Sequence, residues 1–199
     1  MTRRGKIFFL ILLLCLGAGG FYLRSLSRRV FLEPTPRAEE AARAQLNQIA
    51  LQANNGTTQL VTLYFPALNE GKLVAESRSF TWAQADSDRV RQIVLTLAEG
   101  SHEGYGRVLP ASTTVRAVFL ASDGTAYIDL SGDLLSEFEP GIQSETLAIY
   151  SIVNSITVNI PAVKQVHFLI QGQEVETLDG HADLTATYVP DPARVKSSP

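Results

Sequence analysis

Thr114–Ser131, with the sequence TVRAVFLASDGTAYIDLS, is the stretch that decides the fold. Both halves repeat with a period of two, which is typical of β-strands. Asp123-Gly124 between the halves accepts positive φ angles at both central positions of a tight turn. The stretch therefore predicts a β-hairpin around which the other elements pack. In the first half Val115, Ala117 and Phe119 alternate with Arg116, Val118 and Leu120, and in the second Ala126, Ile128 and Leu130 alternate with Tyr127 and Asp129.

Two strands and a helix are predicted before the hairpin. Gln59–Phe65 is rich in β-branched and aromatic residues, which favours a strand that ends at Pro66. Leu73–Phe80 predicts a second strand. A helix is expected to begin at Asp86 or Ser87 and to end before Gly100, because apolar residues fall at helical spacing at Val90, Ile93, Val94 and Leu97.

A second helix and two further strands are predicted after the hairpin. Ser144–Val158 carries apolar residues around more than half of its circumference, which predicts a deeply buried helix. Val163–Gln171 predicts a strand, and Glu174–Leu178 predicts a short edge strand. The predicted fold class is α+β: a mainly antiparallel or mixed β-sheet with two helices packed on one face, formed by residues 57–189.

The N-terminus carries a membrane-targeting pattern. Three basic residues among the first six precede Ile7–Leu23, an uncharged run of seventeen residues. As a helix this run is about 25 Å long, slightly less than the roughly 30 Å hydrocarbon core of a bilayer. It predicts a signal anchor over residues 1–23, retained as a transmembrane helix. The alternatives are a cleaved signal peptide, for which Gly17–Gly20 offers small residues, and a lipoprotein modified at Cys15, which the bulky Leu14 disfavours.

Two further segments are predicted to lie outside the folded domain. Pro34 and Pro36 interrupt any continuous helix from the membrane, and the Ala-rich stretch Arg37–Gln52 has only a thin apolar stripe. Residues 24–56 are therefore expected to form a partly helical linker or stalk. Residues 190–199 contain three prolines and two serines, which predicts a disordered tail.

Charge is unevenly distributed along the chain. Residues 1–56 carry eight Lys or Arg and three Asp or Glu, a net charge of +5, whereas residues 57–199 carry nine and seventeen, a net charge of −8. Nucleic acids and anionic membrane surfaces repel an acidic domain, so neither is an expected partner of residues 57–199. Because the N-terminal segment resembles an export signal, we expect this domain to be extracytoplasmic (periplasmic). It is then either held at the cell membrane by residues 7–23 or secreted after signal cleavage.

The candidate chemical groups do not predict a catalytic residue, a cofactor or a metal ligand. Asp179, His181 and Asp183 share one side of an extended segment and could bind a divalent metal, and His102-Glu103 could act in acid–base catalysis. A solvated turn or loop is the favoured interpretation of both. The same holds for the acidic run of Asp129, Asp133, Glu137 and Glu139, which lacks the spacing of a calcium loop.

One face of the predicted sheet is a candidate partner surface. If Val166, Phe168 and Ile170 face the helices, His167 and Leu169 lie on the opposite face of the sheet. Val118, Leu120 or Tyr127 joins them, depending on the register of the hairpin. A half-apolar open sheet face suggests contact with a partner or self-association. The alternative is that Leu73–Phe80 or the C-terminal segment folds over it.

Several degenerate motifs occur in an order and spacing that resemble a known family. They are Leu63–Phe65, the helix ending at Gly100, Leu109-Pro110 with Thr113, Gly124–Ser131, Glu145 with Ile152–Ile156, and Gly172 with Thr177–Leu184. Together they resemble the GerM-type (GerMN) domain of sporulation and germination proteins and envelope lipoproteins, over roughly Leu60–Leu184. The sporulation protein carries two such domains in tandem, whereas this chain has a single copy. The resemblance implies an extracytoplasmic α/β domain, similar to the ring-building modules of envelope machines, with no known catalytic centre.

These observations together predict a membrane-anchored extracytoplasmic interaction or scaffold domain of the bacterial cell envelope, which is not an enzyme. The expected partners are other envelope proteins, a second copy of the chain, or peptidoglycan. Two alternatives from other classes remain open: a peptidoglycan-binding or peptidoglycan-hydrolase accessory protein, and a sensor domain for small ligands.

Overall fold

The computed structural model describes residues 58–68, 70–138, 141–178 and 180–196. The predicted anchor at Ile7–Leu23 and the predicted linker at residues 24–56 lie outside these residues. None of the helices in the described ranges is both long enough and apolar enough to cross a bilayer. The elements, in chain order, are β1 (Thr58–Pro66), β2 (Leu73–Thr81), α3 (Asp86–Glu99), β3 (Val115–Leu120), β4 (Thr125–Leu130), α4 (Asp133–Glu137), α5 (Ile142–Asn159), β5 (Gln165–Ile170) and the 3-10 helix η2 (Pro192–Arg194).

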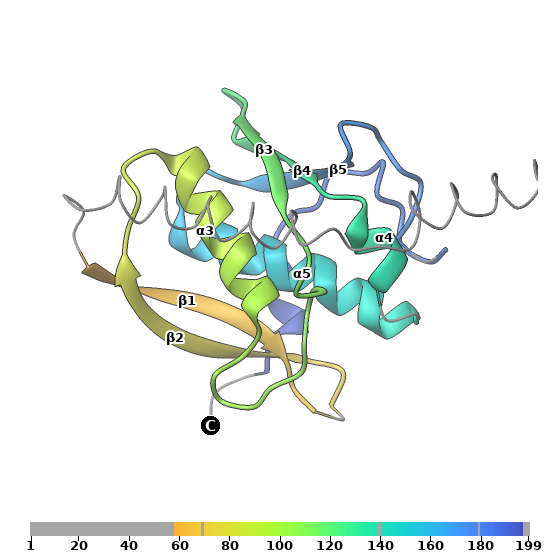
Figure 1. The fold of residues 1–199 in the computed structure, drawn as a ribbon. Helices are drawn as coiled ribbons and strands as arrows, with labels where there is room; N and C mark the ends of the chain where they lie inside the picture. Colours follow the sequence, from red (N-terminus) through yellow and green to blue (C-terminus); the bar gives the residue numbers. More distant parts are fainter. Residues whose placement is uncertain (1–57, 69, 139–140, 179, 197–199) are drawn as a thin grey trace, which may run out of the picture. The chain divides into compact units, whose positions relative to one another are not determined.

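The strands form two sheets, with α3 and α5 between them (Figure 1). One sheet is the antiparallel pair β1–β2, and the other has the order β3–β4–β5, in which β4 runs antiparallel to β3 and parallel to β5. The α+β class is therefore confirmed, but the prediction of one sheet is wrong. Both helices do lie on one face of the three-stranded sheet, and the β1–β2 pair lies on their other side.

Side chains of α5, and no further strand among the described residues, bind the second edge of β1. Ser155 Oγ accepts the Tyr64 N–H at 2.9 Å, and the Ser151 hydroxyl donates to the Tyr64 carbonyl. The Asn159 amide accepts the Thr62 N–H at 3.0 Å and donates to the Thr62 carbonyl at 2.6 Å. A strand edge must satisfy its exposed backbone groups. Polar residues at helical spacing on α5 satisfy this edge of β1 in place of another strand.

The hairpin β3–β4 is present, but its turn differs from the predicted one. Gly124 has a φ angle of +89°, whereas among the described residues other than glycine only Gln171 has a positive φ. The Gly124 N–H donates to the Ala121 carbonyl at 3.1 Å, and the Ala121 N–H donates to the Thr125 carbonyl at 2.9 Å. The connection is thus a type I turn that ends in a left-handed glycine, a common three-residue hairpin loop.

A β-bulge reverses the alternation of side chains along β3. Val115 is paired with Leu130 and Ala117 with Asp129, so two residues of β3 are accommodated where β4 advances by one. Beyond such a bulge each side chain moves to the opposite face of the sheet. Val118 and Leu120 therefore pack toward the core, and Phe119 points to the outer face.

The core lies where the helices meet the inner faces of both sheets. α5 is buried almost all round, as predicted, because it contacts strands on both sides. The largest fully buried side chains come from all layers: Phe65, Leu63, Leu73, Ile93, Leu97, Leu109, Ile128, Leu130, Leu134, Ile149, Ile156 and Ile160.

The C-terminal part of the chain differs from the prediction in two places. Glu174–Leu178 is not a strand, and the only bridge near it joins Gln173 to Ile170 among the described residues. Residues 190–196, for which a disordered tail was predicted, contain η2 and a bridge between Val195 and Leu73. Both segments are placed by hydrogen bonds to elements distant in the sequence, which local patterns do not report.

Candidate functional site: the outer face of the three-stranded sheet

An aromatic row crosses the outer face of the three-stranded sheet. Phe119, Tyr127 and His167 are direct neighbours in register on β3, β4 and β5. Their ring centroids are 6.3 Å apart between Phe119 and Tyr127 and 5.3 Å apart between Tyr127 and His167, within the range of favourable aromatic contact. Phe119 remains 66% exposed.

A second row runs beside the first. Ala117, Asp129 and Leu169 are neighbours in register on the same three strands. Asp129 is largely buried, accepts the Gly172 N–H at 2.7 Å and lies 3.6 Å from the Arg116 guanidinium. The carboxylate is thus partnered on two sides, and it lies between the apolar side chains of Ala117 and Leu169 in this row. We call Ala117, Phe119, Tyr127, His167 and Leu169 the aromatic face.

The structure brings together three of the five residues predicted for a partner surface. Tyr127, His167 and Leu169 lie on the aromatic face, whereas Val118 and Leu120 pack toward the helices. His167 is only 6% exposed, because the Tyr127 ring and Glu174 lie against it, with its Nε2 3.4 Å from Glu174 Oε1. Phe119 was missed because the bulge that turns it outward has no signal in the local sequence pattern.

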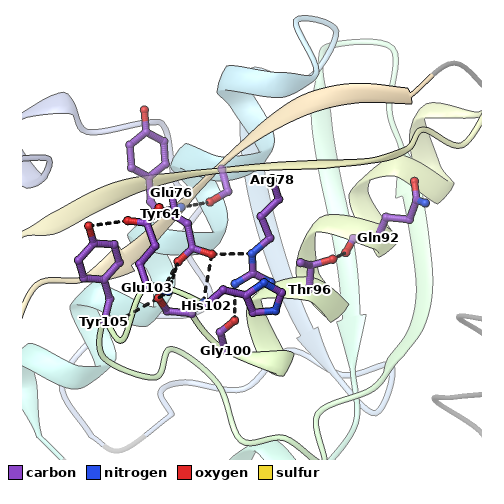
Figure 2. Close-up of polar contacts among 11 residues, drawn as sticks. Tyr64, Glu76, Arg78, Gln92, Thr96, Gly100, His102, Glu103 and Tyr105 are labelled. Carbon is purple, nitrogen blue, oxygen red and sulfur yellow. Dashed lines mark hydrogen bonds and ion pairs between the residues drawn. The ribbon is translucent and has the colours of Figure 1, made fainter.

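A buried carboxylate, that of Glu76, binds the loop that contains His102 and Glu103 (Figure 2). Glu76 on β2 is 2% exposed and points toward this loop. It accepts the Ser101 hydroxyl at 2.6 Å and the His102 N–H at 3.2 Å, and forms an ion pair with Arg78 at 2.6 Å. Glu76 is therefore a loop anchor, and its acceptor positions are occupied by the protein itself.

Arg78 links the anchor to the end of α3. Its Nη2 donates to the Gly100 carbonyl at 2.5 Å, and its guanidinium lies over the Phe65 ring with Cζ 5.4 Å from the centroid. Its buried Nη1 has no hydrogen-bond partner within the described ranges. The contact with the Phe65 ring contributes a cation–π interaction to the same guanidinium. Arg78 thus joins β1, β2 and the loop after α3.

The electrostatics of the loop favour an ionised Glu76. Burial raises the pKa of the Glu76 carboxyl, but hydrogen bonds from Ser101, Arg78 and the His102 N–H outweigh it, and the pKa is lower than the usual 4.5. Glu103 accepts the Tyr105 hydroxyl at 2.8 Å, and this bond raises the pKa of Tyr105. His102 and Glu103, for which acid–base chemistry was the less favoured interpretation, thus sit on a loop in which the Glu103 carboxylate bonds Tyr105 and the Glu76 carboxylate bonds the backbone.

The segment containing His181 is anchored in a similar way. Glu145 in the first turn of α5 is fully buried and accepts the Leu178 N–H at 2.8 Å and the His181 N–H at 3.1 Å. The His181 Nδ1 lies 3.4 Å from the same carboxylate. Asp183 accepts the Thr185 N–H and hydroxyl, which lower the pKa of Asp183. Asp179 lies outside the described residues.

No metal-binding group is formed in the described part of the chain, where no three His, Cys, Asp or Glu side chains lie close enough to hold an ion. The acidic run is split between elements. Asp129 lies on β4, Asp133 and Glu137 belong to α4, and Glu137 accepts the Ser112 hydroxyl at 2.6 Å. The interpretation of this run as a solvated loop is wrong for Asp133 and Glu137, because they belong to the short helix α4.

A groove lies at one end of the domain. It has a volume of about 520 Å³ and is lined by residues of the β1–β2 connection, the loop before β3 and the start of α5, including Leu68, Arg107, Phe138 and Leu147. The sequence analysis did not predict it, because its walls come from segments far apart in the chain. Its lining mixes apolar and charged groups without a buried polar side chain aimed into it.

The fold defines a class: a small α+β domain in which two helices separate a β-ribbon from a three-stranded sheet with an open aromatic face. A family model described as "Germane: Sporulation and spore germination" matches residues 62–176. This match covers more than half of the chain, and the chain belongs to that family. The GerM-type resemblance is thereby confirmed, and the domain is related to sporulation and germination domains. No curated protein sequence matches the chain significantly.

Solved structures of GerMN domains share the fold. The tandem GerMN domains of the sporulation protein GerM from Bacillus subtilis match with a TM-score of 0.52 and 25% identity, over 64% of this chain and 44% of that chain. This chain therefore spans less than half of the tandem protein. The first GerMN domain of the same protein matches with a TM-score of 0.52 and 23% identity, over 69% of this chain and 97% of that one. A putative lipoprotein from Clostridium perfringens matches at a TM-score of 0.47 and 21% identity, over 66% and 87%.

Proposed function

We propose that this chain is a membrane-anchored interaction domain of the bacterial cell envelope, and that it works by docking another envelope protein on the aromatic face. The domain carries no chemical step in this proposal. Residues 7–23 tether it to the membrane, and the acidic domain lies outside the cytoplasm.

The exposed Phe119 is the observation that carries the proposal. The domain already has a well-filled core, and neighbouring apolar residues of β3 pack into it. Phe119 instead lies in register with two other rings on a flat face. Burying such a side chain contributes about 1.5–3 kcal/mol, and phenylalanine, like tyrosine and tryptophan, is enriched in protein–protein interfaces relative to the rest of the surface.

The anchored loops support a docking role over a catalytic one. The two histidines considered for chemistry lie on loops whose backbones are bound by buried carboxylates, Glu76 and Glu145. These carboxylates are engaged with main-chain groups and do not converge on a shared cavity. The arrangement favours a rigid domain that presents a surface.

Site-specific photocrosslinking in living cells tests the proposal. A photoreactive amino acid at position 119 should give a specific adduct of higher mass, identified as a protein by mass spectrometry. Position 60 is the matched control, because Leu60 is 76% exposed on the other sheet. It should give no specific adduct.

The alternatives predict other outcomes. An adduct at position 119 that peptidoglycan-digesting enzymes release would favour the accessory role in peptidoglycan binding over the proposed one. Equal adducts at positions 60 and 119, or none at 119, would contradict the docking role of the aromatic face.

A further inference from the structure

Residues 185–196 form a strap that joins the two sheets across α5. At its start, Tyr188 pairs with Val166 on the outer edge of β5. The Val166 N–H donates to the Tyr188 carbonyl and the Tyr188 N–H donates to the Val166 carbonyl, both at 2.8 Å. This reciprocal pair is the hydrogen-bond pattern of an added antiparallel strand. The strap therefore occupies an edge to which an extended chain can bind.

The middle of the strap is bound to α5. Asn154 donates to the Asp191 carbonyl at 3.2 Å and accepts the Asp191 N–H at 3.0 Å. The Arg194 guanidinium lies over the Tyr150 ring, with Cζ 5.2 Å from the centroid. Tyr150 in turn contacts Tyr188 edge-on, with centroids 5.9 Å apart. One asparagine and one ring of α5 thus recognise the strap along its length.

The end of the strap is bound to the β1–β2 pair. The Lys196 N–H donates to the Leu73 carbonyl at 2.8 Å, and Val195 forms a parallel bridge with Leu73. The Lys196 ammonium pairs with Glu70 at 2.8 Å, and Lys72 donates to the Ala193 carbonyl at 2.5 Å. The strap is the segment of the described chain that contacts the edge of β5, the side of α5 and the start of β2 in succession.

The strap is held by several polar contacts and by one aromatic side chain, because Tyr188 is partly buried and packs against the core with its ring centroid 6.1 Å from that of Phe168. None of residues 185–196 is buried, whereas Val166, Asn154 and Leu73 beneath it are. A surface groove of about 480 Å³ is lined by residues of β1, α5 and the strap, including Tyr64, Thr157 and Val195. Segments with few buried apolar contacts open at low free-energy cost.

A short turn connects the strap to the core. Leu184 is buried and its N–H donates to the Glu176 carbonyl, which fixes the last residue before the strap. Asp183 then bonds the Thr185 N–H at 2.9 Å, and the Ala186 N–H donates to the Asp183 carbonyl at 3.2 Å. Only residues 185–187 separate Leu184 from Tyr188, so a strap that opens must do so about this exposed turn.

We propose that the strap is released as one unit and that the site beneath it accepts the same strap from a second copy of the chain. The edge of β5, Asn154 and Glu70 together form a binding site for an extended segment that ends in a basic residue. Residues 185–196 are the segment that occupies this site in the structure. A strap supplied by another copy makes identical contacts, so exchange between copies costs little beyond opening the hinge.

Amide hydrogen exchange of the full-length chain in detergent tests release. Asn154→Ala removes two hydrogen bonds to Asp191 only, yet exchange of the Val166, Tyr188, Asp191 and Lys196 amides should all rise by a common factor of about ten. Thr146→Ala is the control on the same helix, because its hydroxyl bonds only the Ile142 carbonyl. It should leave the four amides unchanged. A rise confined to Asp191, or no rise, would overturn release as a unit.

A change in hinge length tests exchange between copies. Deletion of Thr185 and Ala186 shortens the connection to one residue, so the strap can no longer fold back on its own β5. The full-length deletion variant should double in protein mass by light scattering relative to the wild type, with the Val166 amide still protected. Insertion of two glycines after Ala186 should leave the mass unchanged. Unchanged mass in the deletion variant, with Val166 protected or exposed, would overturn the exchange.

Discussion

Two buried glutamates explain much of the domain at the scale of single residues. The sequence draws attention to His102 and His181, since histidines near carboxylates are candidates for chemistry. The structure shows that the determining residues are Glu76 and Glu145, which bind loop backbones more than twenty residues away in the chain. Neither contact is readable from a local pattern, because a buried acidic residue in a strand or helix has no distinctive spacing. The sequence could therefore identify the loops but not what holds them.

Replacement of Glu76 should destabilise the domain strongly. Glu76→Gln removes the charge that pairs with Arg78 and places an amide donor among other donors, so we expect the free energy of unfolding to fall by about 3 kcal/mol. Urea denaturation measures this loss. The matched control is Glu103→Gln on the exposed side of the same loop, which should change stability by less than about 0.5 kcal/mol. Equal effects of both substitutions would contradict the anchoring role.

The same carboxylate should make stability depend on pH. The pKa of Glu76 is lower in the folded state than its usual value of 4.5, so its stabilising contribution is fully present above 4.5 and is lost as the pH falls through the lower folded-state value. The free energy of unfolding of the wild type should therefore decrease below this pH. Glu76→Gln should show a smaller decrease in urea denaturation at acidic pH. If the free energy of unfolding depended on pH identically in the two proteins, Glu76 would not be the source of the pH dependence.

At the scale of elements, each strand and helix with a strong sequence pattern was predictable. The structure differs from the prediction where the pairing of two strands changes which face a side chain points to. The strands at residues 59–65, 73–80 and 163–171 and both long helices are confirmed within a few residues. The bulge in β3 is different, because it depends on how β3 pairs with β4 and reverses every side chain that follows. That reversal places Phe119, in place of Val118 and Leu120, on the candidate partner surface.

Paired substitutions on β3 test the bulge. Phe119→Ala removes a side chain that is mostly exposed, so the free energy of unfolding should change by less than about 0.5 kcal/mol. Val118→Ala removes methyl groups packed against the core and should cost about 1 kcal/mol or more. Thermal or urea unfolding of both variants decides the matter. A larger loss of unfolding free energy for Phe119→Ala than for Val118→Ala would contradict the bulge and favour the regular alternation that the sequence suggests.

The polar stripe of α5 is a second feature of element scale. Ser155→Ala leaves the Tyr64 N–H without its acceptor at the edge of β1, and an unsatisfied buried donor costs about 1–3 kcal/mol. Thr157→Ala on the same helix should cost much less, because the Thr157 hydroxyl bonds carbonyls of its own helix. Chemical denaturation compares the two. Equal losses of unfolding free energy for the two variants would contradict the claim that side chains of α5 stabilise the edge of β1.

At the scale of the whole molecule, the sequence predicted the fold class but not the layers. Alternation and helical spacing identify elements, whereas the separation into two sheets depends on which strand edges find a partner. Serine and asparagine side chains of α5 complete β1, and the C-terminal strap completes β5 and the start of β2. These contacts join residues from about twenty to about one hundred and twenty positions apart. The result is a domain whose aromatic face was only partly predictable.

Side-chain footprinting of the chain in its native envelope is the most direct test of this account. Hydroxyl radicals oxidise exposed aromatic side chains, so the modification of each residue can be compared between intact envelopes and the purified full-length protein. The account predicts that oxidation of Phe119 and Tyr127 falls severalfold in the envelope while that of Tyr105, on the anchored loop, stays the same. Equal oxidation of Phe119 in both samples would contradict the claim that this domain acts by docking a partner on its aromatic face.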